Sequence, residues 1–277
     1  MIRVIFNADD FGFSKGVNKG VAYCMKKGIV SSTSLLTNMP STENAFSMIK
    51  KNKIKDVGIH LNISIGRSIN GKSSLTDNKG NFIGAYLLHL KLLFKFVRFN
   101  DIEDEFKSQI EYMIDRGVYP NHIDSHVYVH SYKSILNICI KLAKKYNIPK
   151  IRNSYDSNLL KNYNIFNFQY YILTFVNTMA KSQKKILHTN YIKTTDFFHG
   201  IMQMGSVNPL KYFIQLINNL KEGTHEIMCH PGYVDEELRS CSSYTFEREP
   251  ELKALCSSIL KRRLIQKRIK IIGFNDL

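Results

Sequence analysis

The chain has 277 residues, 44% of them hydrophobic, which is enough to build the core of one large domain or two small ones. Its formal net charge is +16, from 39 Lys and Arg against 23 Asp and Glu. The basic residues are scattered and no nucleic-acid-binding motif accompanies them, so we expect solvated basic helix faces and no nucleic-acid partner.

Cysteine usage and apolar stretches bear on the cellular compartment. The five cysteines are odd in number and form no C-x-x-C pair, which indicates reduced thiols rather than a disulfide framework. Two aspartates interrupt the first apolar run, which argues against a signal peptide. The apolar stretches at 86–99 and 166–180 are too short or too interrupted to span a bilayer. These features predict a cytoplasmic protein without stable membrane insertion, and they leave a homodimer open.

Strand-like and helix-like segments alternate from the N-terminus onward. Strands are expected at 4–6, 33–37, 56–63, 121–126, 150–153, 194–198, 226–230 and 269–274, and helices at 14–28, 41–51, 102–113, 131–146, 165–181, 208–221 and from 250 onward. About eight strands separated by helices, with no linker and no internal repeat, predict one α/β domain over residues 1–277. An irregular (β/α) barrel fits best, since no G-x-G-x-x-G motif supports a dinucleotide-binding fold.

Residues 64–100 interrupt this alternation. Between Gly66 and Gly84 the sequence is rich in Gly, Ser, Asn and Asp, as in long surface loops. A loop of this length within a compact domain usually has a function, so we expect a lid over a site.

Two adjacent carboxylates, Asp9 and Asp10, follow the first expected strand. Like charges this close raise one another's pKa, and burial penalises both ionised forms. A cation bound beside them removes this cost. The alternative is an Asp that caps the next helix beside a solvated neighbour.

Other polar residues stand at the ends of later strands, where parallel barrels collect their catalytic groups. They are His60, His126, Arg152, Asp196 and His230. A single His on an apolar strand is more often a hydrogen-bonded core residue than a ligand. An aspartate and two histidines at converging strand ends instead favour a divalent ion with open coordination positions.

Several stretches together resemble the YdjC-like carbohydrate deacetylases, a family that includes chitin-disaccharide and hopanoid-biosynthesis deacetylases. They are NADDFG at 7–12, GIHLN at 58–62, HIDSH at 122–126, HPGY at 230–233 and the closing segment REPEL at 248–252. The resemblance runs in order from residue 1 to about residue 260.

The resemblance implies an irregular (β/α) barrel that hydrolyses the N-acetyl group of an amino sugar or oligosaccharide. It implies a divalent metal ion, with Mg²⁺ as the first expectation and Zn²⁺ as the alternative. Asp10, His60 and His126 would be the metal ligands.

The resemblance also assigns three catalytic roles. Asp9 would be the general base that deprotonates water, and Arg152 would orient it. His230 would be the general acid for the departing amine or a partner of the oxyanion.

One departure from the family pattern concerns Tyr128, which replaces a histidine expected to share a strand face with His126 and His130. Metal binding should survive this change, whereas contacts with the substrate are expected to differ. A metal-dependent phosphoesterase and a non-catalytic binding protein on the same fold remain the alternatives.

Overall fold

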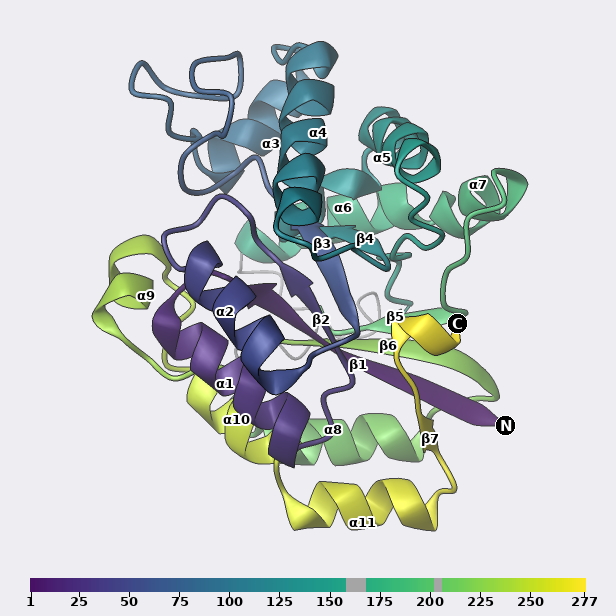
Figure 1. Ribbon diagram of the computed structural model, residues 1–277. Helices are drawn as coiled ribbons and strands as arrows, with labels where there is room; N and C mark the ends of the chain where they lie inside the picture. The colour runs from purple at the N-terminus through teal and green to yellow at the C-terminus, as the bar shows by residue number, and fades with distance from the viewer. Residues whose placement is uncertain (158–167, 202–205) are drawn as a thin grey trace.

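The computed structural model describes residues 1–157, 168–201 and 206–277 (Figure 1). Its centre is a sheet in the order β4-β3-β2-β1-β6-β5, with β7 paired to β1, and every strand pairing is parallel. The described strands are β1 (Ile2–Phe11), β2 (Ser32–Leu35), β3 (Val57–Leu61), β4 (Ile123–Ser125), β5 (Phe197–His199), β6 (Gly223–Cys229) and β7 (Lys270–Ile271). The first strand therefore lies near the middle of the sheet.

Helices lie around this sheet (Figure 1). They are α1 (Lys15–Lys27), α2 (Thr42–Asn52), α3 (Ala85–Leu93), α4 (Phe99–Asp115), α5 (Lys133–Lys145), α6 (Phe168–Ala180), α7 (Gln183–Thr189), α8 (Pro209–Asn218), α9 (Glu236–Cys241), α10 (Arg248–Leu255) and α11 (Ser258–Gln266), with 3-10 turns η1 (His126–Ser131) and η3 (Phe274–Asp276). No helix in the described part of the chain is both long and apolar enough to cross a bilayer.

Helix α1 illustrates how local sequence sets these elements. The Ser14 side chain accepts a hydrogen bond from the backbone N–H of Val17, and the backbone N–H of Gly28 bonds the carbonyl of Cys24. These contacts satisfy backbone groups that a helix leaves unpaired at its ends. Val17, Val21 and Cys24 lie on one face at helical spacing and are fully buried, as the sequence predicts.

The sheet curls beyond β4, which confirms the expected irregular (β/α) barrel. Ile151 forms an isolated parallel bridge with Ile123, and Lys150 forms another with Lys193. The predicted strand at 150–153 is thus reduced to isolated bridges, so seven strands are described rather than about eight. Arg152 follows these bridges, and its backbone N–H bonds the carbonyl of Ile123.

The predicted interruption at 64–100 is shorter in the structure, because α3 begins at Ala85. The sequence of α3 is largely apolar and lacks a clear helical period, so it does not predict a helix. The loop before it is anchored on α4, since the Glu105 carboxylate accepts bonds from the Ser68 hydroxyl at 2.6 Å and the Ile69 N–H at 3.1 Å. The loop is therefore held in place rather than free.

The C-terminal helix prediction also needs correction. The helix expected from residue 250 onward is two helices, α10 and α11. Of the helix predicted at 165–181, residues 168–180 are helical, and its first three residues lie outside the described part of the chain.

Candidate metal and active site

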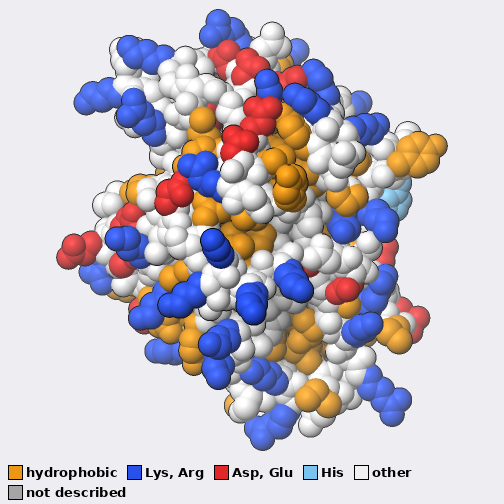
Figure 2. Space-filling model, in the orientation of Figure 1, with side chains coloured by type: hydrophobic (Ala, Val, Ile, Leu, Met, Phe, Trp, Pro, Cys, Tyr) orange, Lys and Arg blue, Asp and Glu red, His pale blue; other side chains and the backbone are white. Residues whose placement is uncertain are grey.

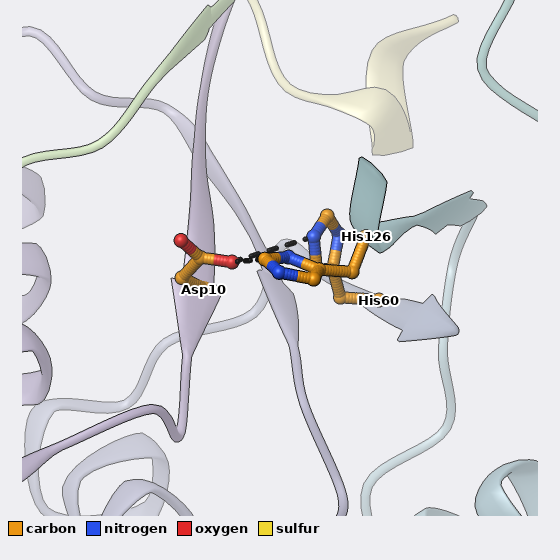
Figure 3. Close-up of side chains that lie close together, drawn as sticks. All are labelled: Asp10, His60 and His126. Atoms are coloured by element: carbon orange, nitrogen blue, oxygen red, sulfur yellow. Dashed lines mark hydrogen bonds and ion pairs between the residues drawn. The ribbon is translucent and has the colours of Figure 1, made fainter. Parts of the chain in front are cut away.

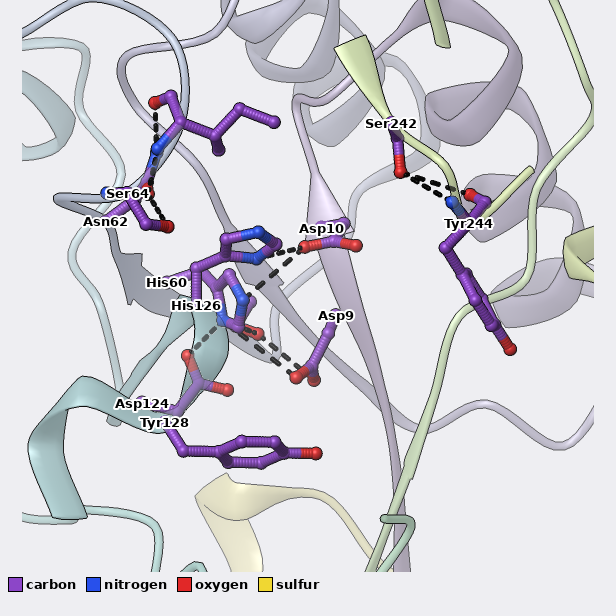
Figure 4. A network of polar contacts seen from close by, with 12 residues as sticks. Asp9, Asp10, His60, Asn62, Ser64, Asp124, His126, Tyr128, Ser242 and Tyr244 are labelled. Carbon is purple, nitrogen blue, oxygen red and sulfur yellow. Dashed lines mark hydrogen bonds and ion pairs between the residues drawn. The ribbon is translucent and has the colours of Figure 1, made fainter. Parts of the chain in front are cut away.

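Asp9 and Asp10 lie within β1, not after it. Adjacent side chains of a regular strand point to opposite faces. The register of β1 against β2 shifts between Ala8 and Phe11, and Asp10 has a φ of 66°, in the left-handed region that Asp tolerates better than most residues. This irregularity allows both buried carboxylates to approach one imidazole, that of His60 (Figure 4).

A glycine is required where the chain leaves this strand. Gly12 has a φ of 100°, and a Cβ there would lie 2.5 Å from the backbone oxygen of Leu36. Any other residue would force β1 and the chain after β2 apart, which would displace the two aspartates.

The three predicted metal ligands come together at the carboxyl ends of β1, β3 and β4 (Figure 3). Oδ1 of Asp10 lies 3.1 Å from Nδ1 of His126 and 3.5 Å from Nε2 of His60. The three ligand atoms lie within 4.8 Å of one another. Ligand atoms about 2.0–2.2 Å from a zinc-sized ion lie roughly 3.3–3.6 Å apart in tetrahedral geometry, close to the 3.1 and 3.5 Å distances from Asp10, so the donor set fits a divalent metal.

The second oxygen of Asp10 is bound by Arg248, which the sequence analysis left without a role. Nη2 of Arg248 donates to Oδ2 of Asp10 at 2.7 Å, so Oδ1 remains directed at the two imidazoles. Burial alone would raise the pKa of Asp10, but Arg248 and His126 hold it well below its usual range. The one sequence signal for Arg248 was its place in the REPEL segment.

His60 is oriented by a second residue that the sequence analysis missed. Its Nδ1 lies 2.7 Å from Oδ1 of Asp124, which leaves Nε2 directed toward Asp10. This is the carboxylate–histidine arrangement that fixes metal-binding imidazoles. Burial lowers the pKa of His60, but Asp124, Asp9 and Asp10 outweigh it and raise the pKa to about 9. The negative charge of these carboxylates, which favours a proton here, would also favour a metal cation that replaces the proton.

Arg152 binds Asp9 as predicted and joins it to two more carboxylates. Its Nη1 and Nη2 lie 2.6 and 2.7 Å from the two Asp9 oxygens. Its Nε lies 2.6 Å from Glu226, and Nη2 lies 2.8 Å from Asp124. All four side chains are buried. Burial raises the pKa of Glu226 to about 8, against the effect of Arg152. A glutamate within the apolar strand β6 was the available sequence signal.

His230 follows β6 and is 7% exposed. Its ring meets that of Tyr244 edge-on with centroids 5.4 Å apart, and within the described residues its Nδ1 has no hydrogen-bond partner. Burial lowers the pKa of His230 to about 4, although Asp10 opposes the shift. The ring is therefore neutral at neutral pH.

The structure corrects two positions from the sequence analysis. Tyr128 does not share a strand face with His126 and His130, because these residues form η1 and Tyr128 has a φ of 56°. Its side chain is buried, and its hydroxyl donates to Sδ of Met228 at 3.1 Å. Asp196 precedes β5 and pairs with Lys184, so it lies at the other end of the strand from the site.

A cleft of about 780 Å³ reaches His126 of this cluster. His126 is part of its lining, and the loop before α3 supplies much of its wall. The other lining residues are Asn38, Met39, Pro40, Ser64, Ile65, Gly66, Arg67, Asn81, Phe82, Gly84, Ala85 and Cys241. Most of these residues are neutral, and they combine amide and hydroxyl groups with apolar surface.

Comparisons with known proteins agree with this geometry. The sequence model of the YdjC-like protein family matches residues 3–266. A carbohydrate deacetylase of Clostridium beijerinckii is 34% identical over 277 residues, covering 100% of both chains. A carbohydrate deacetylase of Halalkalibacterium halodurans is 34% identical over 259 residues, covering 92% of this chain and 95% of that one.

A crystal structure shows the same fold. It is that of an Enterococcus faecalis protein whose proposed role is cellobiose-phosphate cleavage, with a TM-score of 0.82, 24% identity and coverage of 99% and 98% of the two chains. The family match spans nearly the whole sequence and includes every residue of the site described above. This chain belongs to the YdjC-like protein family.

Proposed function

We propose that this chain is a carbohydrate deacetylase, which hydrolyses the N-acetyl group of an amino sugar or oligosaccharide in a metal-dependent reaction. The observation that carries the proposal is the cluster of Asp10, His60 and His126 at the end of the cleft, beside the Arg152-bound carboxylate of Asp9. Full-length relatives named carbohydrate deacetylases support the reaction class.

Asp10, His60 and His126 would hold the divalent ion. When bound, the ion would polarise the amide carbonyl and make water easier to deprotonate. The family resemblance favours Mg²⁺, whereas two imidazole donors favour Zn²⁺, because Mg²⁺ prefers oxygen ligands. Metal dependence is therefore tested with both ions.

Asp9 acts as the general base in this proposal. Two hydrogen bonds from Arg152 fix the plane of its carboxylate, and the Asn7 amide donates a third at 2.8 Å. These bonds hold the carboxylate in one orientation within a buried site. It removes the proton as water attacks the acetyl carbon.

His230 is proposed as the partner of the carbonyl oxygen or as the acid for the departing amine. Because its pKa is lowered to about 4, the resting ring is neutral. A neutral ring can donate a hydrogen bond to the oxygen directly, whereas protonation of the amine requires the ring to gain a proton during turnover.

His230→Gln separates these two roles. Glutamine keeps a hydrogen-bond donor but cannot carry the proton. If His230 is the oxygen partner, we expect the variant to keep a measurable part of its kcat. Near-complete loss of kcat with unchanged metal content instead indicates proton transfer.

Acetate release tests the function as a whole. Purified protein is treated with a chelator, dialysed, and assayed on a panel of N-acetylated saccharides with and without added Mg²⁺ or Zn²⁺. We expect acetate only with metal present. Phosphate release from sugar phosphates without acetate release would identify a phosphoesterase, and neither product with any metal would favour a binding protein.

A further inference from the structure

An unusual group of exposed apolar side chains lies on and just after α3. We name these residues, together with the basic side chains among them, the α3 surface. Its apolar members and their exposed fractions are Tyr86 55%, Leu87 43%, Leu93 52%, Phe94 64%, Phe96 72% and Phe99 39%. Single exposed apolar residues are ordinary, but six within one short segment indicate a surface that binds a protein or a membrane.

The helix is largely apolar, yet only part of it belongs to the core. Leu88 and Leu92 are buried against the rest of the protein. The rings of Phe94 and Phe96 lie beside each other, with centroids 6.3 Å apart. The core therefore buries one side of α3, and the neighbouring large side chains are partly exposed to solvent.

Basic residues alternate with these side chains. Lys91, Lys95 and Arg98 belong to the α3 surface, and residues 85–100 contain no Asp or Glu. Arg98 contacts Asp101 at 3.1 Å but remains 74% exposed. In the described part of the protein, neither Lys91 nor Lys95 takes part in an ion pair. The α3 surface is thus both apolar and cationic.

This combination favours an anionic lipid bilayer over a second copy of the chain. A symmetric contact would bring the cations of the α3 surface against the same cations of the other copy, with no acid in residues 85–100 to pair them. Anionic headgroups supply that charge, while aromatic side chains enter the boundary between headgroups and acyl chains.

The α3 surface also adjoins the cleft. Gly84 and Ala85 line the cleft, and α3 begins at Ala85, beside the loop that forms the cleft wall (Figure 1). On the face shown in Figure 2, the Lys and Arg side chains are spread over the whole surface and not gathered in one patch. We propose that the α3 surface binds peripherally to an anionic lipid bilayer. With only nine residues, α3 lies on the bilayer and does not span it.

Vesicle co-sedimentation of the full chain tests this proposal. The probes are vesicles of phosphatidylcholine alone and of phosphatidylcholine mixed with phosphatidylglycerol, at low and high salt. We expect binding to the mixed vesicles only, and weakening by salt. Phe94→Ser/Phe96→Ser should weaken binding by at least about tenfold, because two aromatic side chains no longer enter the interface. Lys95→Glu should weaken it independently.

The matched control is Ile259→Ser/Ile265→Ser on α11. These side chains are 50% and 75% exposed and stand among Lys261, Arg262 and Arg263. In Figure 1, α11 lies at the end of the molecule away from α3. The control variant should bind the mixed vesicles like the parent protein. Light scattering measures the oligomeric state of the parent and of each variant alongside the binding measurement.

Three results would overturn the proposal. Equal binding of the parent and the Phe94→Ser/Phe96→Ser variant would mean that overall charge alone attracts the protein. Absence of binding to mixed vesicles would exclude the bilayer directly. A parent dimer that the double variant converts to a monomer, without vesicle binding, would assign the α3 surface to a contact between two copies.

Discussion

Both side-chain oxygens of Asp9 are bound by Arg152, at 2.6 and 2.7 Å, and the same guanidinium contacts Glu226 and Asp124. One buried guanidinium thus contacts three buried carboxyl groups. The proposed base is oriented through this group, while the neighbouring Asp10 is bound separately by Arg248 and turns its other oxygen toward the histidines. The two adjacent aspartates are therefore bound by different arginines, and both lie near the imidazole of His60.

Asp9→Asn tests the base. The amide keeps the shape of the carboxylate but cannot take a proton from water. We expect the metal content to stay near that of the parent and kcat to fall by about two to four orders of magnitude. Metal analysis of the purified variant together with acetate release measures both quantities. Full activity in Asp9→Asn would show that another group is the base.

His126→Ala tests the metal cluster. Removal of one of three proposed ligands should abolish metal binding and turnover together, because an aspartate and one imidazole hold an ion weakly. Elemental analysis after dialysis and acetate release are the measurements. His188→Ala, an exposed histidine on α7, is the control and should change neither. Retention of a full equivalent of metal in His126→Ala would remove His126 from the ligand set.

Arg152→Ala tests the charge network through stability. The variant leaves Asp9, Asp124 and Glu226 buried without their shared cation, so we expect the free energy of unfolding to fall by about 3–5 kcal/mol. Urea denaturation measures it. Arg263→Ala on α11, whose guanidinium bonds Asn218 near the surface, serves as the control and should lower it far less. Similar stability of the two variants would contradict a structural role for the network.

Buried neutral histidines predict loss of stability in acid. Burial lowers the pKa of both His130 and His199 to about 3, from an ordinary value near about 6.5. Below pH about 6.5 the unfolded chain binds protons that the folded chain does not, so acid favours unfolding. As the pH falls between these two pKa values, each histidine lowers the free energy of unfolding by up to about 1.4 kcal/mol per pH unit. Above the higher pKa it has no effect.

His199→Gln isolates one of these contributions. The amide does not titrate and can replace the bond that the ring makes with His225 at 2.9 Å. The free energy of unfolding is measured for the parent and the variant from neutral to mildly acidic pH. We expect the variant to lose less stability on acidification. Parallel pH profiles would show that His199 does not contribute.

The sequence by itself determined the alternation of strands and helices and the residues that converge in the candidate metal cluster. Helical spacing in α1 and apolar runs at β1 and β6 are local signals, since they reflect which side of each element is buried. The convergence of Asp10, His60 and His126 could also be predicted from the sequence, because parallel strands all end at one edge of a sheet.

Only the tertiary structure decided which charges meet. Arg248 reaches Asp10 across 238 positions, and Arg152 reaches Glu226 across 74, because β6 lies beside β1 and α10 packs against α1. Alternation of strands and helices does not specify strand order. The alternation also does not reveal the left-handed backbone at Asp10 and Tyr128, a conformation that persists only where the surrounding structure holds it. At Asp10 this backbone breaks the two-residue period of the strand. The partners of the ionised groups therefore depended on long-range packing, whereas the groups themselves were visible in the sequence.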